Sequence, residues 1–526
     1  MPVTDGEMQA YALTLDKFLD HAAKWTAQAE VVSAQPDGTL ARIGYGGLRN
    51  RARRVSQVLH DRGVRPGDRV ATLAWNSQAH LEAWYGIMAM GAVCHTLNPR
   101  LTPDQLAMMI TRSQARLLIA SHDLADLAGR LVEAAGADID LLLIDPDATA
   151  DNAAPARLAP LIDGAEPQVP WGQFDETAPC GLCFTSGTTG APKGVTYTHR
   201  SSYLHTLRLL QTDVLGLSAR DRVLVAVPMF HANAWGLPFA IPAAGARMVL
   251  PGRRLEGAAL AQLIEAEGVT LGVGVATVWL GLLEHIEATG GQTPSLERLV
   301  VGGAPLAPAL MARLEDRLGV TVQTSWGMTE LSPSGTFARP NDPRRAAAQS
   351  GRPAVGVDLL LTDADGRPLA DQRGSEGHLK VKGPAVVRRY FGETAPATDD
   401  DGWFPTGDLA RIDATGELII TGRAKDLIKS GGEWINPAEI EAVVNEVPGV
   451  SLAAVIGRQD PKWGERPILV VQTRSEGVSD EALLSPLHAR VASWWIPDAI
   501  IRLEQMPLAA TGKIDKSRLR AEYGRE

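Results

Sequence analysis

Short apolar runs alternate with amphipathic stretches through the first four-fifths of this 526-residue chain. Residues 69–74, 222–227 and 269–275 are apolar runs of strand length, and residues 78–90 follow the first of them with a helical pattern. A chain that alternates strands with helices can cover both faces of a parallel sheet. The pattern therefore predicts an α/β fold, with a large N-terminal body of sheets covered by helices.

The pattern changes after Gly416. Residues 417–421 form a short strand-like run, and a compact α+β pattern follows it to the end of the chain. A helix is expected from Pro437, because Asn436 is a good N-cap and proline is favoured at the first helical position. We therefore predict a body at residues 1–424 and a small α+β C-terminal lid at residues 425–526.

The composition narrows the classes of partner. The chain has 51 Lys and Arg residues against 61 Asp and Glu, a net charge of -10, which gives no basic surface for DNA or RNA. No secretory signal is visible at the N-terminus, and the longest apolar stretch, residues 271–283, is shorter than the ~20 residues of a membrane span. Cys94, Cys180 and Cys183 are too few for a disulfide framework, so we expect a cytoplasmic protein. We interpret the C-x-x-C pair as two thiols near a buried strand, not as a redox or zinc motif.

The most informative segment follows a strand-like run at residues 181–184. It reads Thr185-Ser186-Gly187-Thr188-Thr189-Gly190-Ala191-Pro192-Lys193-Gly194. Its glycines allow a close backbone approach, and its hydroxyls and ammonium group are donors to anionic oxygens. The string is neither a Walker loop nor a dinucleotide fingerprint, because the spacing of its lysine and glycines differs from both. It predicts a polyphosphate site.

This string resembles the adenylate-forming superfamily of acyl-CoA synthetases, firefly luciferases and peptide synthetase adenylation domains. The resemblance runs from about Leu15 to the C-terminus, with further motifs in family order at residues 228–236, 302–305, 326–330, 403–409, 422–426, 429–434 and 507–514. It is strongest toward medium- and long-chain fatty acyl-CoA ligases and 3-methylmercaptopropionyl-CoA ligases. It implies ATP, Mg²⁺ and coenzyme A as cofactors and co-substrates, a mobile lid with its hinge at Lys425, and a homodimer.

The resemblance also implies roles for individual residues. The expected ATP and AMP contacts are Thr185, Ser186, Gly187, Thr188, Thr189, Gly190, Lys193, Gly303, Ala304, Trp326, Gly327, Thr329, Asp408 and Arg423. The expected acyl contacts are His231, Trp235 and Gly302, and the expected coenzyme A contacts are Lys429, Ser430, Gly431, Gly432 and Trp434. Lys513, Glu330 and His231 are the expected catalytic residues, and Thr185 and Glu330 the expected metal ligands.

The chemistry of these residues suits the implied roles. A carboxylate such as that of Asp408 accepts two hydrogen bonds in one plane, which matches the vicinal diol of ribose. The indole of Trp326, where many relatives carry Tyr, stacks on a purine at least as well as a phenol does. Glu330 offers the oxygen donors that Mg²⁺ shares with phosphates. Arg423 has the rigid donor fork that binds ribose or phosphate oxygens.

The resulting hypothesis is an ATP-dependent acyl-CoA ligase that forms an acyl-adenylate and then a thioester. Medium-chain fatty acids are the expected substrates, with a short thioether acid, 3-methylmercaptopropionate, or an aryl acid as alternatives. A luciferase-like oxygenase and a peptide synthetase module are disfavoured, the second because only 13 residues follow Lys513. A noncatalytic nucleotide sensor is the alternative from another class, and the joint presence of Lys513, Glu330, Asp408 and Arg423 argues against it.

Overall fold

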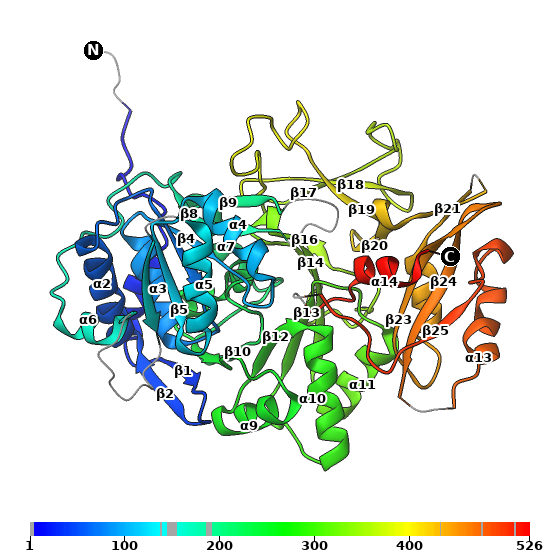
Figure 1. Cartoon of the computed structure of the whole chain (residues 1–526), viewed down its shortest axis with the longest axis horizontal. Helices are drawn as coiled ribbons and strands as arrows, with labels where there is room; N and C mark the ends of the chain where they lie inside the picture. Colours follow the sequence, from blue (N-terminus) through cyan, green and yellow to red (C-terminus); the bar gives the residue numbers. More distant parts are fainter. Residues whose placement is uncertain are drawn as a thin grey trace.

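The computed structural model describes residues 5–136, 139–144, 155–185, 192–431, 433–474, 477–509 and 512–525. Two large, mainly parallel sheets form the body (Figure 1). In spatial order, one consists of β16 (Arg352–Pro353), β15 (Ser334–Phe337), β14 (Thr321–Gly327), β13 (Arg298–Gly302), β12 (Leu271–Val275), β10 (Arg222–Val225), β11 (Arg247–Leu250), β1 (Glu30–Ala34) and β2 (Leu40–Gly44). The other consists of β7 (Ala156–Arg157), β6 (Asp140–Ile144), β5 (Leu117–Ser121), β3 (Arg69–Leu73), β4 (Val93–Thr96), β8 (Pro179–Phe184) and β9 (Gly194–Thr198).

Helices fill the space between the two sheets and cover their outer faces. The central layer contains α1 (Asp16–Trp25), α2 (Tyr45–Asp61), α3 (Gln78–Ala89), α7 (His199–Leu209) and α8 (Leu237–Ala244), with α6 (Leu158–Gly164) packed on α2. The outer layers are α4 (Pro103–Ser113) with α5 (Ala125–Ala135), and α9 (Gly257–Glu267) with α10 (Ala276–Thr289) and α11 (Pro308–Leu318). The α/β expectation for the body is confirmed, since the strands and helix predicted at residues 69–90 are β3 and α3.

A third, antiparallel sheet was not predicted. It consists of β17 (Asp358–Thr362), β18 (Glu376–Lys382), β19 (Phe404–Ile412) and β20 (Leu418–Arg423), and it lies at the top of the body in Figure 1. Its central strands alternate buried and exposed residues, as half-buried antiparallel strands do. The alternation of strands and helices predicted parallel strands through this region, whereas the period-2 alternation of apolar and polar residues indicates antiparallel ones.

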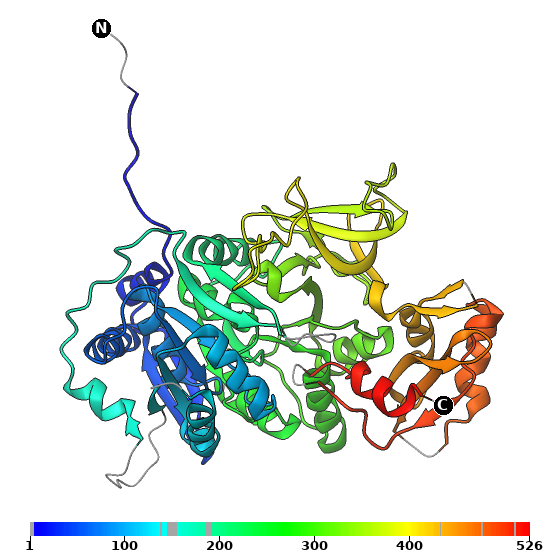
Figure 2. The same cartoon turned by 45° about the horizontal axis from the view of Figure 1, so that its top comes forward.

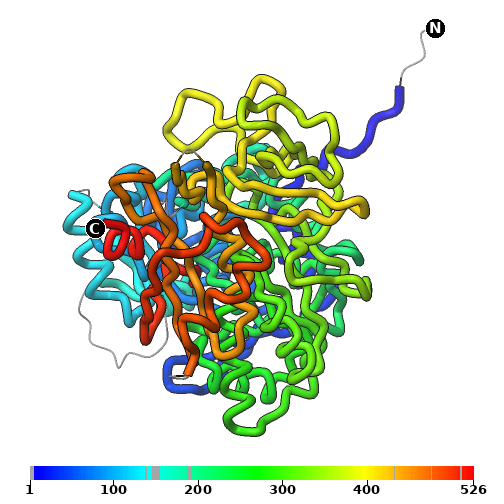
Figure 3. The backbone as a smooth tube through the Cα atoms, turned by 90° about the vertical axis from the view of Figure 1, so that its right-hand side faces the viewer, coloured from blue at the N-terminus to red at the C-terminus, as the bar shows by residue number. Residues whose placement is uncertain are grey.

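The C-terminal part forms a separate small sheet with its own helices, in front of the body in Figure 3. Its strands are β22 (Glu433–Ile435), β21 (Ile428–Ser430), β24 (Gly464–Thr473), β23 (Val450–Asp460) and β25 (Ile500–Arg502), and its helices are α12 (Pro437–Val444), α13 (Asp480–Leu484) and α14 (Lys516–Tyr523). Asn436 caps α12 as predicted, because its side chain accepts a hydrogen bond from the Ala438 backbone. Turning the molecule keeps this part beside the body, with α14 facing it (Figure 2).

Gly351 joins the large sheet to the antiparallel sheet. Its carbonyl accepts a hydrogen bond of 2.8 Å from the Leu418 backbone, and its φ is +84°. A Cβ at this position would lie 1.8 Å from the Phe337 carbonyl carbon and 2.1 Å from the Ala338 nitrogen. Backbone atoms cannot move aside as a flexible side chain can, so the junction requires glycine.

Gly351→Ala should therefore destabilise the body by about 3 kcal/mol, the sum of a left-handed alanine and a backbone clash. The matched control is Gly374→Ala, where φ is +89° but a Cβ meets nothing within 4 Å. It should lose only about 1 kcal/mol, the cost of left-handed geometry alone. Denaturant unfolding followed by tryptophan fluorescence measures both. Equal losses in the two variants would contradict the proposed clash.

Candidate active site

The candidate residues gather where the strands of the large sheet end. Gly302 ends β13, Trp326 lies near the end of β14, and His231 follows β10 by a short loop. The carboxyl ends of parallel strands lie on one edge, where open α/β sheets bind ligands. The body therefore brings these three motifs together although they are far apart in sequence.

Lys513 reaches this edge from the C-terminal part. A Cβ on Gly303 would lie 3.5 Å from the Lys513 Cε and 3.9 Å from the Trp235 Cζ2, so these side chains meet over a glycine whose φ is +84°. The Thr277 hydroxyl also donates to the Gly512 carbonyl at 3.3 Å, which fixes the neighbouring turn to the body. The structure thus brings together three predicted residues from distant motifs.

Burial controls the charge of the groups around Lys513. It lowers the pKa of Lys513 from 10.5 to about 8, with Arg423 and Lys425 acting in the same direction and Asp408 opposing them. Burial, together with the nearby Lys513 charge, lowers the pKa of His231 from 6.5 to about 4. His231 is therefore neutral at neutral pH, when Lys513 is still mainly charged.

Asp408 is held from two sides. Its Oδ1 lies 2.7 Å from the Arg423 Nε, and its Oδ2 accepts a hydrogen bond of 2.9 Å from the Trp326 indole nitrogen. The side chain is buried, which raises its pKa against the opposing charge of Arg423. Trp326 thus does more than offer a stacking face, because its N–H orients the carboxylate expected to bind ribose. A tyrosine at this position has no such N–H to donate.

Glu330 lies in the short 3-10 turn Thr329–Leu331 directly after β14. One carboxylate oxygen accepts a hydrogen bond of 2.9 Å from the Tyr390 hydroxyl, and burial raises the pKa of Glu330. The preceding residue is also fixed, because the Thr329 carbonyl accepts a hydrogen bond of 2.8 Å from Tyr197. Tyr390 was not among the predicted site residues.

The base of the hydroxyl-rich loop is closed by its own backbone. The Thr185 N–H donates to the Lys193 carbonyl at 2.9 Å, and the Lys193 N–H donates to the Thr185 hydroxyl at 3.4 Å. The Lys193 ammonium lies 4.8 Å from the centre of the Tyr390 ring. The predicted contacts Ser186, Gly187, Thr188, Thr189 and Gly190, and Gly432 in the lid, lie outside the described residues.

The donor set fits magnesium held mainly by substrate oxygens. Within the described ranges no group of three or more His, Cys, Asp or Glu side chains could hold a metal. Glu330 and Thr185 both offer hard oxygen donors, and Mg²⁺ typically takes one or two carboxylates together with phosphates and water. These residues would therefore hold the ion only together with a nucleotide, and the ion would neutralise phosphate charge there.

The segment that contains Trp235, one of the predicted acyl residues, has an unusual backbone. Ala232, Asn233, Ala234 and Trp235 have φ between 43° and 55°, and Gly236 has a φ of 78°. A left-handed turn of L-residues costs roughly 1–2 kcal/mol per residue, so contacts must hold it. Its result is an indole placed where a Cβ on Gly302 would lie 2.9 Å from the Trp235 Cη2. The sequence motif indicated Trp235 as a site residue but did not predict this conformation.

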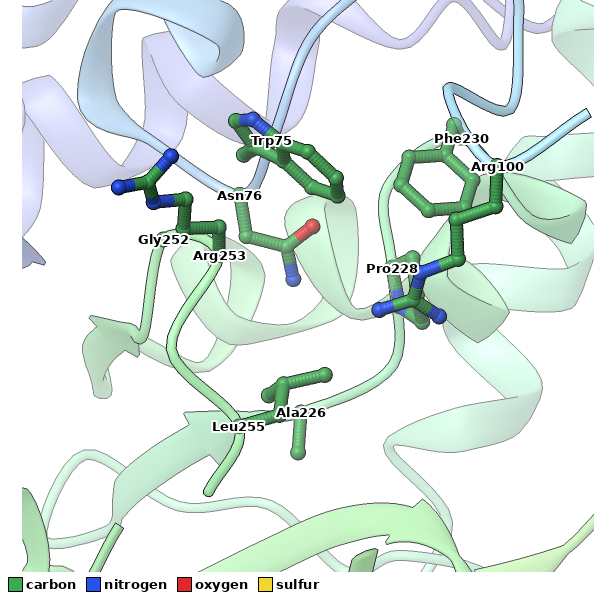
Figure 4. Close-up of a pocket in the computed structure, with 9 residues that line it drawn as sticks. All are labelled: Trp75, Asn76, Arg100, Ala226, Pro228, Phe230, Gly252, Arg253 and Leu255. Carbon is green, nitrogen blue, oxygen red and sulfur yellow. The ribbon is translucent and has the colours of Figure 1, made fainter. Parts of the chain in front are cut away.

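A small pocket flanks the same segment on the Phe230 side (Figure 4). Trp75, Asn76, Arg100, Ala226, Pro228, Phe230, Gly252, Arg253 and Leu255 line it. In Figure 4 the Arg100 side chain points between Phe230 and Pro228, whereas the Arg253 guanidinium points away. The pocket shares no residue with the group around Lys513, so it does not enlarge the candidate acyl site.

The described part of the predicted coenzyme A residues contacts other residues of the C-terminal part. The backbone N–H of Lys429 donates to Glu465 at 3.1 Å, the Ser430 hydroxyl accepts from Arg466 at 3.2 Å, and the Gly431 N–H donates to the Trp463 carbonyl at 2.7 Å. Trp434 is 54% exposed. The hairpin that carries them is thus pinned to β24 and the turn before it, within the lid.

Comparison with known proteins gives consistent matches. The AMP-binding enzyme family matches residues 18–391, and the AMP-binding enzyme C-terminal domain matches residues 439–513. A 3-methylmercaptopropionyl-CoA ligase from Ruegeria lacuscaerulensis is 41% identical over 98% of both chains. A medium-chain-fatty-acid–CoA ligase from Ectopseudomonas oleovorans is 39% identical over 99% of this chain and 97% of its own.

Solved structures agree with the sequence matches. ATP-bound MatB from Rhodopseudomonas palustris has a TM-score of 0.86 at 27% identity, covering 97% of this chain and 99% of that chain. The apo form of the same protein has a TM-score of 0.76, covering 98% of this chain and 99% of that chain. None of the helices in the described ranges combines the length and apolar character needed to cross a bilayer.

The lowered pKa of Lys513 can be measured directly. Only the neutral amine reacts with acetic anhydride, so labelling of the Lys513 peptide should rise with a midpoint near pH 8. Asp408→Asn removes the charge that raises this pKa, so its midpoint should be lower. Competitive labelling with mass spectrometry measures both. A midpoint near the ordinary lysine value would contradict burial of this ammonium group.

Proposed function

The chain belongs to the AMP-binding enzyme family and is an AMP-forming acyl-CoA synthetase, and we propose that Lys513 is the residue on which its first half-reaction depends. The observation that carries this proposal is the meeting of Lys513 with Gly303 and Trp235 at the strand ends. The alternative of a noncatalytic sensor has no support, because curated relatives across nearly the full length are acyl-CoA ligases.

In the proposed first step the carboxylate attacks the α-phosphorus of ATP and pyrophosphate leaves. Negative charge builds around the phosphorus, so positioned cations and donors supply most of the rate enhancement. Lys513 bridges the carboxylate and the α-phosphate. The charges of Arg423 and Lys193 both lower the pKa of Glu330, against the larger effect of burial. These cations distribute the phosphate charge.

The adenosine part of ATP is proposed to bind on the side of Lys513 away from the β- and γ-phosphates. Gly303, Ala304 and Gly327 present backbone to the adenine, and Trp326 stacks on it. Asp408 accepts the ribose hydroxyls, already oriented by Trp326 and Arg423. Thr185, Thr329 and the hydroxyl-rich loop complete the phosphate site, with Glu330 and Thr185 as the proposed magnesium ligands.

For the second step we propose that the lid, residues 425–526, rotates about Lys425. This would withdraw Lys513 and bring Lys429, Ser430, Gly431, Gly432 and Trp434 toward coenzyme A. Two observations support the proposal. The hairpin of these residues is hydrogen-bonded within the C-terminal part here, and the TM-score is higher to ATP-bound MatB (0.86) than to apo MatB (0.76). His231, neutral and beside Lys513, would shield the carboxylate between the steps.

The acid is proposed to be a medium-chain fatty acid. A relative named as a medium-chain-fatty-acid ligase and one named for 3-methylmercaptopropionate are 39% and 41% identical to this chain. Sequence identity therefore does not separate the two acids, and the residues that line the acyl pocket must distinguish them. His231, Trp235 and Gly302 would line it. The short thioether acid is the second candidate, because the Trp235 indole occupies the space beside Gly302. An aryl acid is the third.

Two further expectations stay predictions. A homodimer is implied only by the family resemblance. A cytoplasmic location agrees with Cys94, Cys180 and Cys183, which are buried free thiols.

The role of Lys513 separates the two half-reactions. Lys513→Ala should reduce acyl-dependent ATP–pyrophosphate exchange on the order of 10²-fold or more, as loss of a preorganised donor does. Thioester formation from a supplied acyl-adenylate should remain close to the wild-type rate. Lys24→Ala, an exposed lysine on α1, is the control and should change neither. Equal losses in both half-reactions would argue against the assignment.

Chain length should identify the acid. Each buried methylene contributes about 0.8 kcal/mol, so kcat/KM should rise roughly fourfold per carbon until the chain meets Trp235. We expect the maximum among medium-chain acids in a panel from C3 to C16 with 3-methylmercaptopropionate and a cinnamate. Trp235→Gly should move it to longer chains. A maximum at the thioether acid or the cinnamate would replace the medium-chain proposal by the corresponding alternative.

A further inference from the structure

One segment between strands β18 and β19 contacts both the turn of Glu330 and the end of the hydroxyl-rich loop. We call residues 385–391, which follow β18, the bridging segment. Its contacts are the Ser332 hydroxyl donating to the Ala385 carbonyl at 2.9 Å, the Val387 N–H donating to the Glu330 carbonyl at 2.7 Å, and the Phe391 N–H donating to the Gly194 carbonyl at 2.8 Å. The bridging segment therefore fixes the Glu330 turn on one side and the end of the hydroxyl-rich loop on the other.

Tyr390 makes the corresponding connection with its side chain. Its hydroxyl donates to the Glu330 carboxylate at 2.9 Å, while the Lys193 ammonium lies 4.8 Å from its ring centre. The ring itself is packed edge-on against Phe404 at 6.4 Å, which limits its rotation. One rigid side chain thus touches an anion and a cation that belong to separate motifs.

Each contact restricts one charged group. A hydroxyl donating to one oxygen of a carboxylate fixes the plane of that carboxylate and leaves the second oxygen as the donor to a metal. An ammonium over a ring face is held by the ring quadrupole, although a lysine stem has many rotamers. Tyr390 therefore sets the separation and orientation of Glu330 and Lys193 before ATP binds.

We propose that Tyr390 is a positioning residue for adenylate formation. It holds the carboxylate of Glu330 and the ammonium of Lys193 at fixed positions around the triphosphate. This inference rests on the proposed function, in which Glu330 is a magnesium ligand and Lys193 contacts phosphate. Tyr390 touches neither substrate nor metal. Tyr390 affects the positions of the two charged groups, so its loss should change the affinities for the metal and for the nucleotide.

Two variants separate the two contacts. Tyr390→Phe keeps the ring beside Lys193 and removes only the hydroxyl, so Mn²⁺ binding in the presence of α,β-methylene-ATP should weaken about tenfold, as for lost partners of metal ligands. Binding of the nucleotide analogue without metal should stay unchanged. Tyr390→Leu removes both contacts, so metal-free nucleotide binding should also weaken, by about threefold. Electron paramagnetic resonance of free Mn²⁺ and titration calorimetry give the two constants.

A structural role alone would give a different result. Tyr45→Phe removes a buried tyrosine hydroxyl that donates to the Ala246 carbonyl at 2.7 Å, and it should bind Mn²⁺ and nucleotide as the wild type does. In Tyr390→Phe, thioester formation from a supplied acyl-adenylate should also equal the wild-type rate. Loss of that step together with Mn²⁺ affinity would indicate general destabilisation and overturn the inference.

Glu330→Gln distinguishes failure of this inference from failure of the proposed function. If it weakens Mn²⁺ binding while Tyr390→Phe does not, only the role of Tyr390 is overturned. If Glu330→Gln leaves Mn²⁺ affinity unchanged, the metal assignment fails and the inference falls with it. Weakening in both variants, with the larger effect in Glu330→Gln, supports both.

Discussion

A buried ammonium group placed against a glycine turn is the contact on which the rest of the site depends. Lys513 comes from the C-terminal part and Gly303 from the body, and the Lys513 Cε lies 3.5 Å from the position that a Cβ on Gly303 would take. Burial lowers the pKa of this ammonium to about 8, so its charge depends on its neighbours. Asp408 supports it, whereas Arg423 and Lys425 oppose it. Under the proposed function, the first half-reaction thus depends both on the position of the C-terminal part and on the charges around Lys513.

The charge balance around Lys513 depends on body residues that are held in fixed positions. The helix layer between the two sheets buries apolar side chains from both, so the strand ends that carry Gly302 and Trp326 have fixed positions. The antiparallel sheet adds Asp408, paired with Arg423 across β19 and β20. The left-handed turn at Trp235 is stable only because such a frame surrounds it, since an isolated chain would relax from it.

Local signals in the sequence predicted a large part of this arrangement. The apolar runs gave β3, β10, β12 and β13, and the N-cap at Asn436 gave the start of α12, because burial and capping act over a few residues. The motif order identified Lys513, Asp408 and Glu330. Tyr390 could not be found in this way. Its importance comes from contacts with residues 60 and 197 positions away, Glu330 and Lys193, and no local pattern records them.

The charges around Lys513 suggest why the two half-reactions would need different positions of the lid. Arg423 and Lys425 both lower the pKa of Lys513, so these cations repel one another, and the Asp408 carboxylate offsets only part of that repulsion. ATP would supply further negative charge, so under the proposed function nucleotide binding holds the lid in the orientation seen here. Loss of pyrophosphate removes most of the compensating charge. Because Glu330, Tyr390 and Lys193 all belong to the body, the proposed rotation of the lid would leave their positions relative to one another unchanged.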